Sequence, residues 1–126
     1  MLSQAQRKAI PASDMLLGKE IYMKHCMTCH QSDGTGAQNM IPPLIKTEYV
    51  LGPKATLIEI LLKGLNGEIK VNGDLYANEM PSQAILKDDE IAAVLTYVRN
   101  SFGNKASSVT VREVKKVRNT IQKRPL

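Results

Sequence analysis

The sequence predicts an all-α domain in which three helices share one core, with one small β-hairpin and an extra C-terminal helix. Its length of 126 residues suits a single compact domain. Apolar residues recur at helical spacing in three stretches, whereas only one short stretch alternates and carries a turn signal. Aromatic residues are 4% of the chain and Trp is absent, so we expect a bound group to supplement a thin core.

The first helix is expected over residues 14–25, with Ser13 or Asp14 as its N-cap. Its apolar positions have helical spacing and are Met15, Leu17 and Ile21. Gly18 lies in the middle of this helix, where glycine costs about 1 kcal/mol relative to Ala. We therefore expect another helix to pass close to Gly18.

The second helix is expected in "KATLIEILLKGL", residues 54–65, ending near Gly64 or Gly67. One face of it carries the apolar side chains Leu57, Ile58, Leu61, Leu62 and Leu65. Between this helix and the third, Ile69 and Val71 alternate with polar residues, and Asn-Gly follows at 72–73. This pattern predicts a β-hairpin with a type I′ turn over residues 68–76.

The third helix is expected from Asp88 to about Phe102, where Gly103 ends it. Three acidic residues fill its first turn, where the helix dipole favours negative charge. Its buried stripe consists of Ile91, Val94, Leu95 and Val98. We expect this helix to cross the first one, so that Val94 and Tyr97 meet Gly18 and Tyr22.

Both cysteines and both histidines of the chain fall in one stretch, residues 25–30, with the sequence HCMTCH. A disulfide between Cys26 and Cys29 would close only a tight loop and stabilise little. A thioredoxin-like pair needs a preceding strand, and structural zinc needs a second pair of ligands; the sequence offers neither. C-x-x-C-H is the signature of covalent haem attachment, with a chance match as the alternative. We expect Cys26 and Cys29 to bond one haem c and His30 to ligate its iron.

A six-coordinate haem needs a second axial ligand, and methionine is the remaining soft ligand type. His25 adjoins Cys26 on the anchored side of the ring, so we expect it to be exposed. Met80 is the predicted ligand because the chain between it and His30 can cross the haem edge and because Pro81 stiffens its loop. Met40 is the main alternative. Met23 and Met27 flank the attachment site and cannot reach round the ring, and Met15 lies on the same predicted helix.

Several motifs give residues 13–103 a resemblance to the class I c-type cytochromes. "GKEIYMKHCMTCH" has Gly18 and Tyr22 where the family has a glycine and an aromatic residue before the haem motif. "IPPL" resembles the family's Pro-x-Leu segment, and "EMP" resembles its axial-Met loop. "LKDDEIAAVLTYVRNSFG" resembles the C-terminal helix, with Tyr97 as its aromatic residue. The hairpin resembles that of domains attached to periplasmic dehydrogenases and copper nitrite reductases.

The resemblance implies the cytochrome c fold, with three core helices around one covalently bound haem. It implies that the backbone carbonyl of Pro42 accepts the imidazole N–H of His30. The implied function is one-electron transfer between a periplasmic donor and an oxidase or reductase, by a carrier that is not itself an enzyme. A tethered subunit or excised domain of a larger redox enzyme is the alternative, and a haem peroxidase or ligand sensor is a further one.

The same resemblance implies a periplasmic or extracytoplasmic location, although residues 1–14 lack the apolar segment of a signal peptide. Redox proteins are the expected partners, and a catalytic subunit or a membrane complex is a further candidate. No nucleic-acid partner is expected.

The sequence divides into an N-terminal extension at 1–13, a cytochrome c domain at 14–103 and a basic C-terminal extension at 104–126. Residues 1–103 hold 10 Lys and Arg against 11 Asp and Glu, whereas residues 104–126 hold 7 against 1. Thr110 and Glu113 form a capping box, which predicts a helix from Val111.

This amphipathic C-terminal helix has two interpretations. Either its apolar face packs on the domain, or the whole helix docks on a partner or on anionic lipid and is disordered alone. In both cases we expect its basic face to steer the protein towards a partner with an acidic docking surface.

Overall fold

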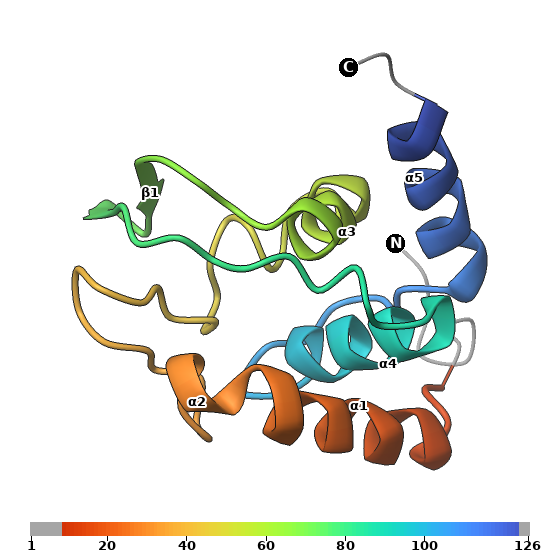
Figure 1. Cartoon of the computed structure of the whole chain (residues 1–126). Coiled ribbons are helices and arrows are strands. Elements are labelled where there is room, and N and C mark those ends of the chain that lie inside the picture. The colour runs from red at the N-terminus through yellow and green to blue at the C-terminus, as the bar shows by residue number, and fades with distance from the viewer. Residues whose placement is uncertain (1–8, 124–126) are drawn as a thin grey trace.

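A computed structural model describes residues 9–123 as a mostly helical molecule with one two-stranded antiparallel hairpin (Figure 1). Among these residues no helix is both long and apolar enough to cross a bilayer. In chain order the elements are α1 (Ala12–His25), α2 (Met27–His30), α3 (Lys54–Lys63), β1 (Ile69–Val71), β2 (Asp74–Tyr76), α4 (Asp88–Arg99) and α5 (Val111–Lys123).

Helices α1 and α4 lie against each other in the lower part of Figure 1. They approach most closely at Gly18. A Cβ atom added to Gly18 would lie 2.6 Å from Cβ of Tyr97 and would also collide with the Ala93 carbonyl. The Tyr22 ring is 1% exposed and its centroid lies 5.6 Å from that of Tyr97. The predicted crossing is therefore confirmed, but Ala93 rather than Val94 lies against Gly18.

Helix α1 begins earlier than predicted, and the predicted N-caps are wrong. Ser13 and Asp14 both lie inside the first turn, and Pro11 occupies the N-cap position without a side-chain cap. The Pro11 carbonyl accepts the backbone N–H groups of Asp14 and Met15 at 3.1 and 3.3 Å. Because proline has its φ angle fixed near the helical value, the chain turns into the helix directly after it.

Helix α4 ends at Arg99, three residues before the predicted end. Phe102 has a φ of 59°, which no helix allows, and its ring lies against Tyr22 with the centroids 5.5 Å apart. The chain leaves the helix before Phe102, and its ring packs against α1 instead of continuing α4 by another turn. Helix α3 ends at Lys63, and Gly64 is its C-cap with a φ of 74°. Leu65 therefore lies beyond the helix, and the prediction that it belongs to the apolar face of α3 is wrong.

The β-hairpin is confirmed, with Ile69 paired to Tyr76 and Val71 to Asp74. Asn72 and Gly73 have φ angles of 50° and 87°, as the predicted type I′ turn requires. Val71 and Tyr76 are buried, so the strands turn these side chains towards the body of the molecule.

Helix α5 packs against α3 and α4, at the end of the molecule opposite the hairpin (Figure 1). Val114 is 0% exposed, and Val109 just before the helix is also buried. Val117 and Ile121 pack partly buried against the same core. The interpretation that α5 packs on its own domain is therefore confirmed, and the interpretation that it is disordered alone is wrong.

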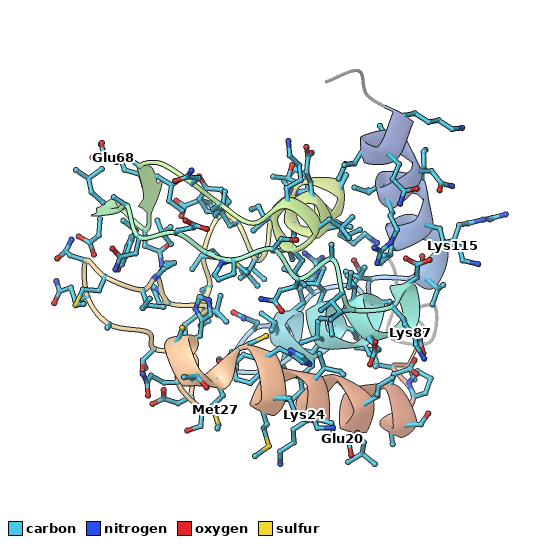
Figure 2. The ribbon with its side chains drawn as sticks, viewed as in Figure 1. Glu20, Lys24, Met27, Glu68, Lys87 and Lys115 are labelled. Carbon is cyan, nitrogen blue, oxygen red and sulfur yellow. The ribbon has the colours of Figure 1, made fainter. Side chains whose placement is uncertain are left out.

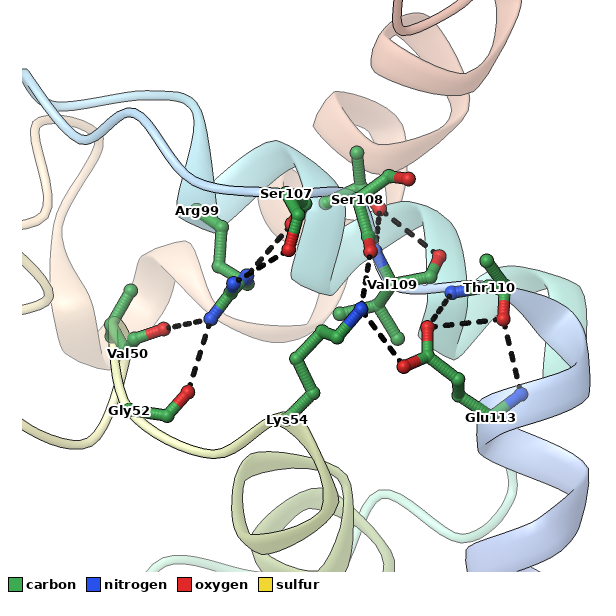
Figure 3. Close-up of polar contacts among 10 residues, drawn as sticks. Val50, Gly52, Lys54, Arg99, Ser107, Ser108, Val109, Thr110 and Glu113 are labelled. Carbon is green, nitrogen blue, oxygen red and sulfur yellow. Dashed lines mark hydrogen bonds and ion pairs between the residues drawn. The ribbon is translucent and has the colours of Figure 1, made fainter. Parts of the chain in front are cut away.

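Polar groups fasten the segment before α5 (Figure 3). The Arg99 guanidinium donates to the carbonyls of Val50 and Ser107, at 2.8 and 2.9 Å. Thr110 and Glu113 form the predicted capping box, and Lys54 Nζ lies 2.8 Å from Glu113 Oε2. These contacts connect the start of α5 to the start of α3.

We expect the attachment of α5 to weaken in acid because of Glu113. Burial raises the pKa of Glu113, but hydrogen bonds from Lys54 and Thr110 outweigh burial and hold the pKa below its ordinary value of 4.5. A carboxylate with a lowered folded-state pKa stabilises the fold above its ordinary pKa, and this contribution disappears as the pH falls through the folded value.

Glu113→Gln should therefore lower the free energy of unfolding at pH 6 by up to about 1 kcal/mol, because the ion pair is partly exposed. The difference from the unsubstituted protein should shrink as the pH falls below about 4.5. Urea unfolding at pH 6 and at a pH below about 4.5 measures this difference. Glu20→Gln, on the exposed face of α1, is the control. If the difference in unfolding free energy does not depend on pH, the ionised Glu113 carboxylate is not what stabilises the attachment of α5.

Candidate haem-binding site

The two cysteines lie where α1 passes into the short helix α2. The backbone N–H of Cys26 donates to the Tyr22 carbonyl at 2.9 Å, at the end of α1. The backbone N–H of His30 donates to the Cys26 carbonyl at 3.0 Å, within the turn of α2. In a helical turn, residues three and four apart lie on one face. Cys26, Cys29 and His30 consequently all line one cavity of about 130 Å³.

His30 is oriented by Pro42. Its Nδ1 lies 2.9 Å from the carbonyl oxygen of Pro42, so an N–H at Nδ1 donates to that oxygen and leaves Nε2 free. Gly36 supports this contact, since its N–H donates to His30 O at 3.0 Å and its φ is 65°. A Cβ atom at Gly36 would lie 2.7 Å from the Pro42 oxygen, so only glycine allows the carbonyl to stay there.

Met80 reaches the same cavity from the chain between β2 and α4. A β-bridge holds its backbone, because Leu65 and Met80 exchange two N–H···O bonds of 2.9 Å each. Met80 also lines a second, smaller cavity, which borders the first and shares Cys29, His30 and Pro42 with it. The Met80 side chain is therefore available to a group held by the cysteines and His30.

The larger cavity is lined almost entirely by apolar side chains. Helices α3 and α4 contribute to it, and Ile69 and Val71 of β1 line it on the hairpin side. The main apolar residues of the lining are Leu44, Val50, Leu57, Ile60, Leu61, Leu65, Ile69, Val71, Val94, Leu95 and Val98. Such a lining suits a large apolar ring and disfavours a hydrated ion.

Burial also affects the titratable groups of the cavity. It raises the pKa of the Cys26 thiol to about 11, with a further contribution from Cys29. It lowers the pKa of His30, although the hydrogen bond to Pro42 acts in the opposite direction. A buried, neutral imidazole with one nitrogen bonded is the form of histidine that binds a metal.

All five predicted site residues come together at this cavity: Cys26, Cys29, His30, Pro42 and Met80. His25 is exposed as predicted, although it borders the cavity. Met40 is 59% exposed and lines only the smaller cavity. Among the described residues there is no cluster of three or more His, Cys, Asp or Glu that could hold a metal ion.

Sequence reasoning missed three residues that support the site. Gly36 lies behind the Pro42 carbonyl, Gly64 lies against the Met80 segment, and Ser82 in that segment donates its hydroxyl to the Leu62 carbonyl. The two glycines have positive φ angles, of 65° and 74°. The only available signal was the glycine residue type, which does not reveal what lies opposite it.

The residues fit a covalently bound haem. Two thiols three residues apart, a histidine with a free Nε2 and a methionine meet in one apolar cavity within a helical fold. This arrangement defines a class I monohaem c-type cytochrome. The chain belongs to the cytochrome c family, whose model, Cytochrome c, matches residues 15–102. Members of this family carry haem c and transport electrons.

Cytochrome c-552 of Thermus thermophilus is a relative of similar length. It is 41% identical over 111 residues, which cover 80% of this chain and 83% of that protein.

Other relatives are longer subunits of dehydrogenases. The cytochrome c subunit of the quinone alcohol dehydrogenase of Gluconacetobacter polyoxogenes is 33% identical over 124 residues. This match covers 95% of the chain but 25% of that subunit. The fructose dehydrogenase cytochrome subunit of Gluconobacter japonicus is 33% identical over 106 residues, covering 80% of this chain and 22% of that subunit. The chain thus spans about a quarter of these relatives.

Proposed function

We propose that this protein carries single electrons through one low-spin haem c, attached to Cys26 and Cys29 and ligated by His30 and Met80. The observation that carries the proposal is that His30 and Met80 line the same apolar cavity as the two cysteines. When bound, the haem supplies the one-electron couple. The chain itself acts as a carrier and catalyses no reaction of its own.

The side chains and backbone around the cavity set the properties of the site. Pro42 holds the His30 ring in one tautomer and increases the basicity of its free nitrogen. The thioether of Met80 is a weak donor and raises the reduction potential. The apolar lining excludes water and penalises the extra charge of the oxidised form.

An absorption and redox study of the purified holoprotein tests this function. We expect reversible one-electron oxidation and no binding of carbon monoxide at neutral pH, because both axial positions are filled. Binding of carbon monoxide or turnover of peroxide at native pH would instead support the second candidate, a peroxidase or ligand sensor.

The partners and the location are also proposals. The relatives named as dehydrogenase cytochrome subunits support a role in which the chain, or a longer protein containing it, receives electrons from a catalytic subunit. The periplasmic location is proposed from the resemblance to the class I c-type cytochromes. The relative of similar length supports a free carrier, and an oxidase or reductase is its proposed electron acceptor. Co-purification of the native protein from its source distinguishes the two, since only a subunit stays bound to a catalytic chain.

The exposed face of α5 is the proposed docking surface for an acidic partner. The cations on this face are Arg112, Lys115, Lys116 and Lys123, all of them exposed. Lys115 projects away from the body in Figure 2. Arg118 and Lys54 are instead bound to Asp88 and Glu113, each at 2.8 Å. Among the described residues, these four exposed cations take part in no ion pair, so they are available to a partner.

The charges at the opposite end are mostly acidic, with Lys70 as an exposed cation on the hairpin. Glu68, Asp74 and Glu79 are exposed on the hairpin and just before Met80, and Figure 2 shows Glu68 at that end. The apolar face of α5 is used in packing, so little of it remains to enter a lipid layer. These observations favour an acidic protein as the partner of α5.

Replacing the four exposed cations of α5 by Gln should remove most of the salt dependence of electron transfer. At low ionic strength the rate to an acidic copper protein should fall on the order of tenfold, because steering is lost. Stopped-flow mixing across ionic strengths measures this. The matched control replaces two exposed cations of α1, Lys19 and Lys24, by Gln. An unchanged salt dependence in the α5 variant would show that the steering charges lie outside α5, and the proposed docking surface would be wrong.

A further inference from the structure

The segment that carries Met80 is fastened to the C-terminal end of α3. Beyond the Leu65–Met80 bridge, the Ser82 hydroxyl donates to the Leu62 carbonyl at 2.7 Å. The next backbone N–H, that of Gln83, donates to the Leu61 carbonyl at 2.7 Å. The last carbonyls of a helix have no partner within the helix. Helix α3 therefore offers them as acceptors to the Met80 segment.

Gly64 makes this close approach possible. It ends α3 with a φ of 74°, and a Cβ atom there would lie 2.8 Å from Ser82 N and 3.0 Å from the Pro81 carbonyl carbon. The same Cβ would collide with the Met80 carbonyl oxygen. Any larger residue would push the Met80 segment away from α3.

Ser82 itself lines neither cavity, and the residue is exposed. Its hydroxyl also accepts the backbone N–H of Ala84 at 3.1 Å, which stabilises the turn beyond Met80. Ser82 can consequently affect a haem ligand only through the position of the Met80 segment.

We propose that Ser82 and Gly64 are positioning residues that hold Met80 on the haem iron and set how readily an external ligand replaces it. This inference rests on the proposed ligation by Met80. Departure of Met80 moves its segment off α3 and breaks the Ser82–Leu62 bond. The bond therefore stabilises the Met80-bound state relative to the open state, and the open state is the one that binds an external ligand.

Imidazole binding to the oxidised holoprotein at neutral pH measures the population of the open state. Ser82→Ala should tighten the apparent affinity for imidazole about fivefold, which corresponds to the loss of one hydrogen bond of about 1 kcal/mol. Ser82→Thr keeps the hydroxyl and should restore the affinity to that of the unsubstituted protein. Gly64→Ala should have a larger effect than Ser82→Ala.

Thr120→Ala is the matched control, because Thr120 also donates its hydroxyl to a helical carbonyl, that of Lys116 at 2.9 Å, but on α5. It should leave the affinity unchanged. If Ser82→Ala lowers the melting temperature but binds imidazole as the unsubstituted protein does, its role is structural and the inference is wrong. If the unsubstituted protein lacks the charge-transfer band of a Met–Fe(III) bond, the proposed ligation fails instead.

Discussion

Replacing Met80 by Ala should abolish the weak long-wavelength charge-transfer band of the oxidised protein and lower its reduction potential. The band arises from the sulfur–iron bond, and a thioether favours Fe(II) because it is a weak donor. Axial ligands set potentials over a range of about 0.8 V, so the decrease should be well resolved. Absorption spectroscopy and potentiometry measure the two effects.

Met40→Ala is the matched control for this experiment, because Met40 is the other methionine that borders a cavity of the site. It is 59% exposed and does not line the larger cavity, whereas Met80 lines both cavities and is held by the bridge to Leu65. Met40→Ala should leave the band and the potential nearly unchanged. The reverse pattern would assign the ligand to Met40.

Gly18→Leu should destabilise the protein by about 3 kcal/mol, through overpacking at the crossing of α1 and α4. Even a methyl group at Gly18 would overlap the Ala93 carbonyl and lie 2.6 Å from the Tyr97 side chain, and both belong to a well-packed helix. The two helices must separate to admit a leucine, which also loosens the contact between Tyr22 and Tyr97. Urea unfolding of the holoprotein gives the free energy.

Lys19→Leu adds the same side chain at the next residue of α1, which is exposed. Its effect should stay within about 0.5 kcal/mol, the usual range for surface substitutions. A similarly small effect of Gly18→Leu would show that the two helices do not approach closely at Gly18.

The sequence was most informative where the chemistry is local. The C-x-x-C-H motif fits within one turn and a half of helix, so its spacing alone brings Cys26, Cys29 and His30 to one side. Asn72 and Gly73 likewise determine the hairpin turn through their own backbone preferences. The capping box of Thr110 and Glu113 predicted the start of α5 for the same reason.

The sequence was less informative where a contact between distant residues determines the end of a helix or the role of a side chain. Phe102 continues the helical pattern of α4, but its ring packs on α1, and this contact ends the helix early. Ser82 gave no sign of its role, because its acceptor is a helix carbonyl twenty residues away in the chain. No property of Gly36 indicates that the carbonyl opposite it orients His30.

The core contribution of α5 means that the cooperative folding unit is larger than the family match, which ends at residue 102. Val109 and Val114 lie in the same apolar cluster as Ile58 and Leu95. Arg99, inside the match, donates to Ser107 beyond it. We therefore expect the amides of α5 to exchange in the same unit as those of α3 and α4, so that a transplanted domain needs residues up to the end of α5 to retain its native cooperativity.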